Sequence, residues 1–412
     1  MTSARGDVLR AANAIAAQVV STRRRIHRQP ELGFQVQGTA GLVAERLGEL
    51  GLQVRTEVGG SGVVGLLEGG GSGGTVLLRA DMDALPIQEA SGVSFASERP
   101  GIMHACGHDA HTAMLLGVAE LLTERRRMFD GRVVFMFQPA EEVGGVDSGA
   151  VRMIAAGVLD DPPVDAAFAL HVDAAFSGQI ALMPGPAMAS TDSFTITVRG
   201  SGGHAARPQR TVDPIVVGAQ IVGALQTLVS REVAPEQPAV VTVGKFTSGS
   251  AANVIPDTAE LRGTIRCYRP SVREMLLRRV AELSAGIASA MRASAECVIK
   301  PGYPVLVNDP AMVSLAADTA AELLGPDVLV PGGRLMGGED FACVLQRVPG
   351  AMLRLGVTDR AWDTPRPKHS ARFDLDERAL PAGVALVAGT ALRWLEAHGS
   401  RVPPPATVLR PS

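Results

Sequence analysis

Short apolar strands alternate with helices through the first part of the chain, and this alternation restricts the fold more than any other feature of the sequence. Residues 63–67 and 75–80 have the composition of buried strands, and residues 111–122 have the apolar spacing of a helix. Two further apolar strands are indicated at 132–138 and 164–170. Strands and helices in this order predict an α/β domain with a largely buried sheet.

The rhythm changes near residues 184–186, where a second unit begins. A strand at 193–198 is followed by a helix that opens at Asp213 and Pro214, since Asp is a good N-cap and Pro suits the first helical turn. The remaining elements of the unit are strands at 240–246, 259–267 and 296–300 and a long amphipathic helix at 271–292. The order β-α-β-β-α-β is that of a compact ferredoxin-like α+β unit.

Strand and helix signals of the first kind resume after about residue 304 and end with a helix at 377–396. We therefore predict two domains. An α/β domain, with a mixed sheet flanked by helices, is built from residues 1–184 and 303–412, and the ferredoxin-like domain is inserted between them at 185–302. The Pro-rich last dozen residues are expected to be frayed.

Composition excludes several classes of protein. A hydrophobic fraction of 46% and a charged fraction of 20% are those of a globular chain, and the net charge of −3 provides no basic field that would attract nucleic acid. The glycine run at 69–74 lacks the G-x-G-x-x-G order of a nucleotide-binding loop.

Cysteine usage and apolar runs bear on the compartment. The four cysteines are Cys106, Cys267, Cys297 and Cys343. Their wide spacing does not suggest a disulfide framework, so a reducing compartment is favoured. We find no apolar run approaching the roughly 18 residues of a membrane span, and residues 11–20 indicate a surface helix rather than a signal segment, because Asn13 and Gln18 interrupt them. We expect a cytoplasmic protein with no membrane partner.

Five short segments combine potential metal ligands with carboxylates. They are RADMDALP at 79–86, HACGHDAH at 104–111, QPAEE at 138–142, LH at 170–171 and KH at 368–369. Any one of them alone has an ordinary explanation, such as a satisfied core histidine, a buried small thiol or a solvated pair of glutamates. Together they follow or end predicted strands, which is where open α/β sheets build their sites. Thiolate and imidazole donors suit borderline metals such as zinc.

These segments resemble the M20 metallopeptidase family, in its amidohydrolase branch of aminoacylases, hippurate hydrolases and auxin-conjugate hydrolases. The resemblance runs from about residue 23 to the final helix. It is carried by RRIHRQPELG at 24–33, DMDALP at 81–86, HACGHD at 104–109, FQPAEE at 137–142, GHAA at 203–206, NVIP at 253–256 and EDF at 339–341. Within it, the Cys-Gly-His-Asp and Pro-Ala-Glu-Glu segments are the most specific.

The resemblance implies a site for two divalent ions, zinc or manganese in the first place, with cobalt or nickel as further possibilities. The implied ligands are Cys106, His108, Glu142, His171 and His369. Cys106 stands where other branches of the family have a bridging aspartate, and a thiolate can bridge two ions as well. Glu141 would act as general base, because neighbours on an extended segment point to opposite sides and only one of the two glutamates can face the metals.

Other residues acquire roles by the same resemblance. His204 would stabilise the oxyanion from the lid domain of a partner subunit, which implies a homodimer formed through the lid, although a surface histidine in a glycine turn is the alternative. Asn253 and Arg266 would contact the substrate, with Arg266 forking onto the α-carboxylate, or else Arg266 makes an ordinary ion pair. Asp83 and Asp109 would orient metal-bound histidines.

The implied activity is metal-dependent hydrolysis of the amide bond of N-acyl-L-amino acids. A dipeptidase or an N-carbamoyl-amino-acid amidase of the same family is an alternative, as is a catalytically silent dimeric binding protein. That last class would lack a ligand or the base, and this chain lacks neither. Gln35 and Val36 replace the usual glutamates and Gln209 replaces a frequent histidine, so these positions could alter specificity.

Overall fold

A mixed eight-stranded sheet forms the centre of the larger domain in the computed structural model, which describes residues 7–399. Its strands lie in the order β1 (Gln53–Val58), β2 (Gly62–Glu68), β4 (Arg132–Gln138), β3 (Thr75–Asp81), β5 (Ala166–Phe176), β16 (Gly350–Thr358), β6 (Ile180–Leu182) and β15 (Leu329–Pro331). The central strands β4, β3, β5 and β16 are parallel, and β1, β2 and β6 introduce antiparallel pairs. β3 is buried along its whole length, as expected for a strand covered on both faces.

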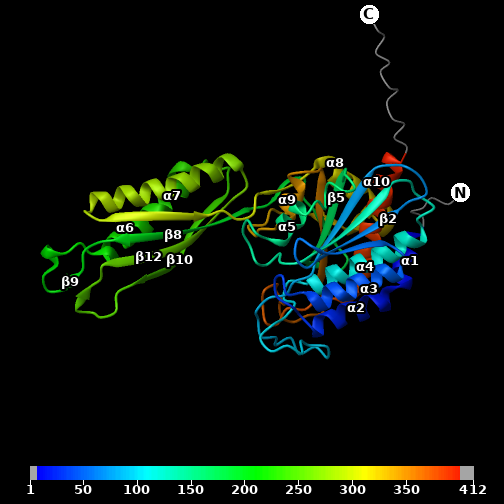
Figure 1. The fold of residues 1–412 in the computed structure, drawn as a ribbon, viewed down its shortest axis with the longest axis horizontal. Helices are drawn as coiled ribbons and strands as arrows, with labels where there is room; N and C mark the ends of the chain where they lie inside the picture. Colours follow the sequence, from blue (N-terminus) through cyan, green and yellow to red (C-terminus); the bar gives the residue numbers. More distant parts are fainter. Residues whose placement is uncertain (1–6, 400–412) are drawn as a thin grey trace, which may run out of the picture.

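Helices cover both faces of this sheet (Figure 1). The larger layer consists of α1 (Val8–Ala14), α2 (Ala16–Arg28), α3 (Gln37–Glu49), α4 (His108–Glu124), α8 (Pro310–Leu324) and α10 (Leu380–His398), and the opposite layer of α5 (Gly149–Ala155) and α9 (Phe341–Leu345). Side chains alternate between the layers: Leu78 packs in the core of the first, whereas Leu77 packs in that of the second with Phe341. The sheet is therefore covered by apolar side chains on both faces.

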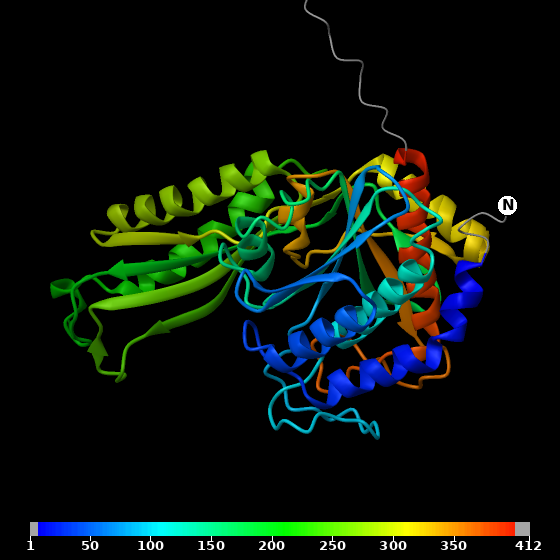
Figure 2. The ribbon, with the colours of Figure 1, turned by 45° about the vertical axis from the view of Figure 1, so that its right-hand side comes forward.

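The inserted domain has a separate core and projects from the larger domain (Figure 1). Its antiparallel sheet has the order β10 (Ala239–Ser248), β12 (Thr258–Cys267), β8 (Ser190–Arg199) and β13 (Ser294–Lys300). α6 (Pro214–Thr227) and α7 (Pro270–Ala290) cover one face of that sheet (Figure 2). Asp213 caps α6 by accepting a hydrogen bond from the backbone N–H of Ile215, as its sequence position predicts. The β-α-β-β-α-β order and the mixed-sheet fold class are confirmed.

The chain crosses between the domains along two paired strands. β7 (Gly185–Met188) and β14 (Leu306–Asn308) are antiparallel, and Ala187 and Leu306 pack in the core of the larger domain. The core of the inserted domain draws on residues between Phe194 and Ile299. We propose that the domains divide beside this two-stranded ladder, close to the predicted boundaries.

Several elements differ from the sequence predictions in their bounds. The surface helix predicted at residues 11–20 is part of two helices interrupted at Ile15, and α4 begins at His108 rather than three residues later. The strands β1 and β16 were not predicted individually. The Pro-rich last dozen residues, which were expected to be frayed, lie outside the part of the chain that is described.

One stretch, Pro214–Glu232, is long and apolar enough to cross a membrane by length and composition alone. The prediction concerned unbroken apolar runs, and this stretch is interrupted by Gln220 and Gln226. In the structure, the stretch consists of α6 and the turn of π-helix after it, and Val217, Ile221 and Leu225 pack against the sheet of the inserted domain. The core helix of a globular domain passes the same test.

Candidate metal centre

A cleft of about 750 Å³ lies between the two domains. The larger domain contributes the ends of its parallel strands and the loops after them, and β12 of the inserted domain contributes Thr264 and Arg266. Four of the five predicted metal ligands line the cleft. The fifth, His108, is fully buried and lies close to Cys106.

Tight backbone turns bring the donors together. Gly107 adopts φ +88°, and a Cβ atom at this position would lie 2.5 Å from a methyl carbon of Val172, so only glycine fits between Cys106 and the start of α4. His369 and Ala140 are non-glycine residues with φ of +62° and +55°. Left-handed backbone at such residues costs energy and is concentrated at functional sites.

Cys106 belongs to two groups of donor atoms at once. Its sulfur clusters with His108 and His171 on one side and with Glu142 and His369 on the other, and within each group the donor atoms lie within 4.8 Å of one another. The sulfur is 3.6 Å from Nε2 of His171, and Nε2 of His369 is 3.2 Å from Oε1 of Glu142. The structure thus brings all five predicted ligands into one cluster with the thiol at its centre.

The chemical state of these side chains fits a pair of divalent ions. Nδ1 of His108 donates to the carbonyl oxygen of Asp83 at 2.8 Å, which leaves its buried Nε2 without a hydrogen-bond partner in the described part of the chain. Nδ1 of His171 donates to the carbonyl of Val172 at 2.6 Å, so the lone pair of Nε2 faces Cys106. Burial, together with the Lys368 ammonium, lowers the pKa of His171 well below its usual value, which keeps the ring in its coordinating neutral form.

Glu141 lies beside the cluster but outside both thiol groups. Its carboxylate is close to those of Glu339 and Asp340, and it also approaches His108. Burial and the surrounding carboxylates, with Glu339 first among them, raise the pKa of Glu141 well above its usual value. Glu142 contacts His369 at 3.2 Å, and the carboxylates of both glutamates also lie near His108.

Asp83 joins the segments that carry these groups. Its two carboxylate oxygens accept hydrogen bonds from the backbone N–H groups of Glu141 and Glu142, each at 3.0 Å, and its own carbonyl accepts from His108. The predicted orienting role for Asp83 is therefore compatible with its contacts. The prediction for Asp109 was wrong, because its carboxylate contacts Arg23 and His27 rather than a histidine of the donor cluster.

A buried ionic network beneath the cluster was not predicted. The Arg79 guanidinium lies 2.7 Å from Asp81 and 3.0 Å from each of Glu339 and Asp340. His111 donates through Nδ1 to Asp81 at 2.6 Å. The sequence did contain a signal for His111, since it lies three residues after His108 and therefore on the same face of α4.

The three predicted residues of the inserted domain lie in two places. Arg266 faces the cleft. His204 and Asn253 are exposed, and they lie in and beside the small ladder of β9 (Gly203–His204) and β11 (Val254–Ile255), where the N–H of Ala205 donates to the Asn253 carbonyl. This ladder lies at the end of the domain that points away from the donor cluster (Figure 1), so a single chain does not bring His204 to its own metal ligands.

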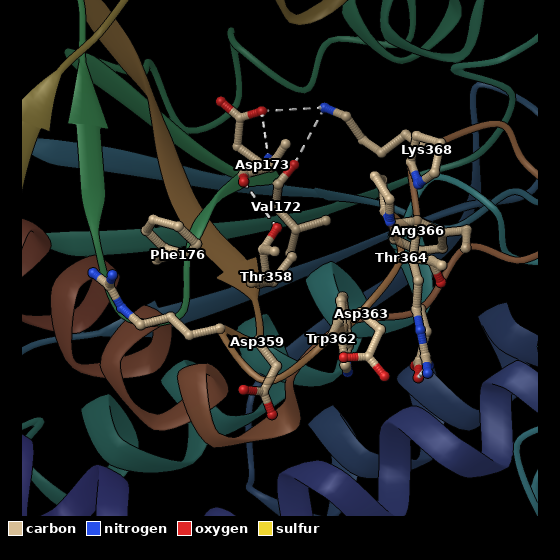
Figure 3. A pocket seen from close by; sticks show the side chains of 17 residues that line it. Val172, Asp173, Phe176, Thr358, Asp359, Trp362, Asp363, Thr364, Arg366 and Lys368 are labelled. Atoms are coloured by element: carbon tan, nitrogen blue, oxygen red, sulfur yellow. Dashed lines mark hydrogen bonds and ion pairs between the residues drawn. The ribbon is translucent and has the colours of Figure 1, made fainter.

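A second hollow of about 670 Å³ adjoins the cleft (Figure 3). Phe176, Trp362 and Arg366 contribute to its walls, and it shares Asp173 and Lys368 with the cleft. The Lys368 ammonium donates to the Val172 carbonyl at 3.3 Å and lies 3.9 Å from Asp173. None of the five donors lines this hollow, so it is separate from the candidate metal centre.

Comparison with protein families gives a match to the model described as Peptidase family M20/M25/M40 over residues 77–393. The IAA-amino acid hydrolase ILR1-like 4 of Arabidopsis thaliana is 41% identical over 92% of this chain and 86% of that protein. Thermostable carboxypeptidase 2 of Saccharolobus solfataricus is 40% identical, covering 91% and 95%. The N-acetyl-L-cysteine deacetylase of Bacillus subtilis is 38% identical, covering 94% and 90%.

Among solved structures, the Bacillus subtilis YXEP protein, described as a dinuclear metal binding peptidase from the M20 family, superimposes with a TM-score of 0.81. It is 34% identical in sequence, and the match covers 93% of this chain and 99% of that one. Similarity therefore extends over both domains and includes the cleft between them.

Proposed function

From the premise that this chain belongs to peptidase family M20/M25/M40 and is a metal-dependent amide hydrolase, we propose that it cleaves N-acyl-L-amino acids. The observation that carries the proposal is the composition of the cleft, in which Arg266 faces the donor cluster and Glu141. A guanidinium opposite a hydrolytic centre suits a substrate with a carboxylate on one side of its amide bond.

The five donors around Cys106 would hold the two ions. Bound there, divalent ions supply Lewis acidity toward the amide carbonyl and lower the pKa of the attacking water. The chain's own part is to orient His108 and His171 through their bonds to the Asp83 and Val172 carbonyls, and to keep His171 neutral. Zinc and manganese are the ions we favour, because sulfur, nitrogen and oxygen donors are mixed.

Glu141 is proposed as the general base and then the general acid. Its carboxylate takes the proton of the attacking water and later gives it to the leaving amine, which requires a pKa near the working pH. The buried site beside Glu339 supports this role, since it raises the pKa of Glu141. The Asp83 carboxylate keeps the Glu141 backbone in place, and the Tyr303 hydroxyl donates to the Glu141 carbonyl.

The charges lining the cleft favour acylated substrates over dipeptides. Its carboxylates are Glu141, Glu142, Asp173 and Glu339. The first two belong to the reaction centre. Asp173 is paired with Arg354 at 3.1 Å, and Glu339 is paired with Arg79. The α-ammonium group of a dipeptide would therefore find no available carboxylate in the cleft, whereas a neutral acyl group needs none.

We further propose that the active form is a homodimer in which His204 and Asn253 of each subunit complete the site of the other. Their distance from the donor cluster within one chain supports this arrangement. An imidazole placed near the amide carbonyl would stabilise the developing oxyanion.

A substrate panel tests the proposed function. The metal-loaded protein is assayed with N-acetyl amino acids, hippurate, dipeptides and N-carbamoyl amino acids, before and after chelation and reloading with zinc or manganese. We expect kcat/KM for the best N-acyl substrate to exceed that for dipeptides by at least about tenfold. Preference for dipeptides or N-carbamoyl amino acids would replace the substrate assignment, and no turnover of any compound would favour a binding protein.

A further inference from the structure

The segment from Arg23 to Gly33 contains the motif at 24–33, and the reaction described above gives it no role. Arg23 and His27 lie one turn apart on the buried side of α2, and both reach the same carboxylate oxygen of Asp109. The Nε–H of Arg23 donates to it at 2.9 Å, and Nδ1 of His27 donates at 2.8 Å. Asp109 directly follows His108, so these bonds fix the first turn of the helix that carries a proposed ligand.

The second half of the segment contacts two other parts of the site. The backbone N–H of Ala84, next to Asp83, donates to the Glu31 carbonyl at 2.7 Å. The N–H of Ala140, next to Glu141, donates to the Gly33 carbonyl at 3.1 Å. Residues 23–33 are thus bonded to three separate segments, namely those of His108, Asp83 and Glu141.

The segment is itself firmly anchored. The Glu31 carboxylate accepts hydrogen bonds from the backbone N–H groups of Gly38 and Thr39 at 3.0 and 2.8 Å, which ties it to the first turn of α3. Arg23 also donates to Glu377 at 2.9 Å, from the short turn before α10. Buried polar contacts of this kind stabilise one arrangement strongly, because removing one partner leaves the other unpaired.

We propose that residues 23–33 form a brace that sets the place of His108 relative to the Glu141–Glu142 loop, and that His27 is its central positioning residue. This inference rests on the proposed function only in taking His108 as a metal ligand and Glu141 as the reacting carboxylate. It does not depend on which amide is cleaved.

The charge of His27 strengthens the contact to Asp109. Burial alone would lower the pKa of His27, but the carboxylates of Asp109 and Glu89 outweigh it and raise the pKa to about 9. The ring therefore carries a proton on each nitrogen, with Nδ1–H directed at Asp109 and Nε2–H at Glu89, 3.2 Å away. A charged donor makes a shorter and stronger hydrogen bond than a neutral one.

Two substitutions of His27 test the roles of its two ring nitrogens separately. In His27→Asn, the amide N–H₂ can replace Nδ1 and still donate to Asp109, whereas in His27→Gln it replaces Nε2 and the Asp109 bond is lost. Gln18→Ala is the matched control, because Gln18 donates to Glu120 at 2.6 Å and so joins the same two helices, α2 and α4, away from the site. Zinc affinity is measured by competition with a chromophoric chelator, and the cobalt-substituted protein is compared by visible absorption.

We expect His27→Gln to weaken zinc binding at least about tenfold and to change the cobalt spectrum. His27→Asn should restore most of the affinity, and Gln18→Ala should match the wild type. Arg23→Lys is measured in parallel in case His27→Gln does not fold. Lysine has a single ammonium group and cannot reproduce the two guanidinium hydrogen bonds of Arg23 to Asp109 and Glu377. Wild-type affinity and an unchanged spectrum in His27→Gln, or in Arg23→Lys if only that variant folds, would overturn the brace. If the wild type binds zinc but cleaves no acylated amino acid, the proposed function fails while this test still stands.

Discussion

The Sγ atom of Cys106 lies 3.6 Å from Nε2 of His171, and the same sulfur also closes the second donor group with Glu142 and His369. One thiol is therefore common to both halves of the cluster. Removing it should disturb both proposed ion sites, whereas removing any other ligand should weaken one site more than the other.

Cys106→Ala should reduce bound metal to less than one ion per chain and abolish turnover, because the remaining donors would lose their shared anionic ligand. Metal content by plasma emission spectroscopy and kcat/KM on the best acylated substrate measure the two effects. Cys297→Ala, which changes a half-buried thiol on β13 in the inserted domain, serves as control and should retain both metal and rate. Two ions per chain in Cys106→Ala would contradict the bridging role.

Glu141→Gln tests the division of labour between the adjacent glutamates. The amide keeps the shape of the side chain but cannot accept a proton, so kcat should fall by about 10²- to 10⁴-fold with metal content unchanged. Glu142→Gln should instead lose metal, since Glu142 is the carboxylate that faces His369. Equal metal loss in both variants would mean that Glu141 is a ligand as well.

Arg266→Ala should raise KM for acylated amino acids by about 10- to 100-fold, the effect expected for loss of a charged hydrogen bond. The effect on kcat should be smaller, because the guanidinium is proposed to bind substrate rather than to react. Arg262→Ala is the control on the same strand, where Arg262 pairs with Glu260 at the surface. A substrate amide without a carboxylate should show little difference between wild type and Arg266→Ala, and a large difference would argue against carboxylate recognition.

The sequence was sufficient to predict the donor cluster because parallel strands end at a common edge. Glu142 lies just after β4, and His171 lies within the buried part of β5, so sheet geometry brings these two donors to one side of the sheet; Cys106 lies beyond the loop after β3, next to the start of α4. The extended backbone that was expected at Glu141 and Glu142 is not seen, because the two residues lie in a turn after Ala140, whose φ is +55°.

The sequence could not give the relationships that depend on packing between distant segments. Asp109 was assigned to a metal-bound histidine from its place beside His108, but α2, more than 80 residues earlier, presents Arg23 and His27 to it. Similarly, β16 lies between β5 and β6 in the sheet, although β5 and β6 are neighbours in the sequence. No local sequence pattern indicates this strand order.

Stability should depend on pH through His27. The groups that face its ring are Asp109, Glu89, Arg23 and His104. The folded pKa of about 9 lies above the ordinary value of about 6.5, so its contribution is fully present below pH 6.5 and is lost as pH rises through 9. The shift corresponds to about 3 kcal/mol, and His27→Asn should remove this part of the pH dependence. Urea unfolding at pH 6 and pH 9.5 gives the change in unfolding free energy between the two pH values. The same change in wild type and in His27→Asn would exclude His27 as its source.

Complementation between two inactive variants tests the proposed dimer. Glu141→Gln lacks the base but retains His204 on the inserted domain. His204→Ala lacks the imidazole but retains Glu141 and the donor cluster. In a mixed dimer, the Glu141 of one subunit would meet the His204 of the other, so one of its two sites would be restored. Random exchange puts about half of the chains in mixed dimers, and the mixture should therefore recover about a quarter of the wild-type activity. Each variant alone, taken through the same dissociation and reassociation, is the control. No recovery in samples where labelled subunits have demonstrably exchanged would mean that His204 does not act across the interface.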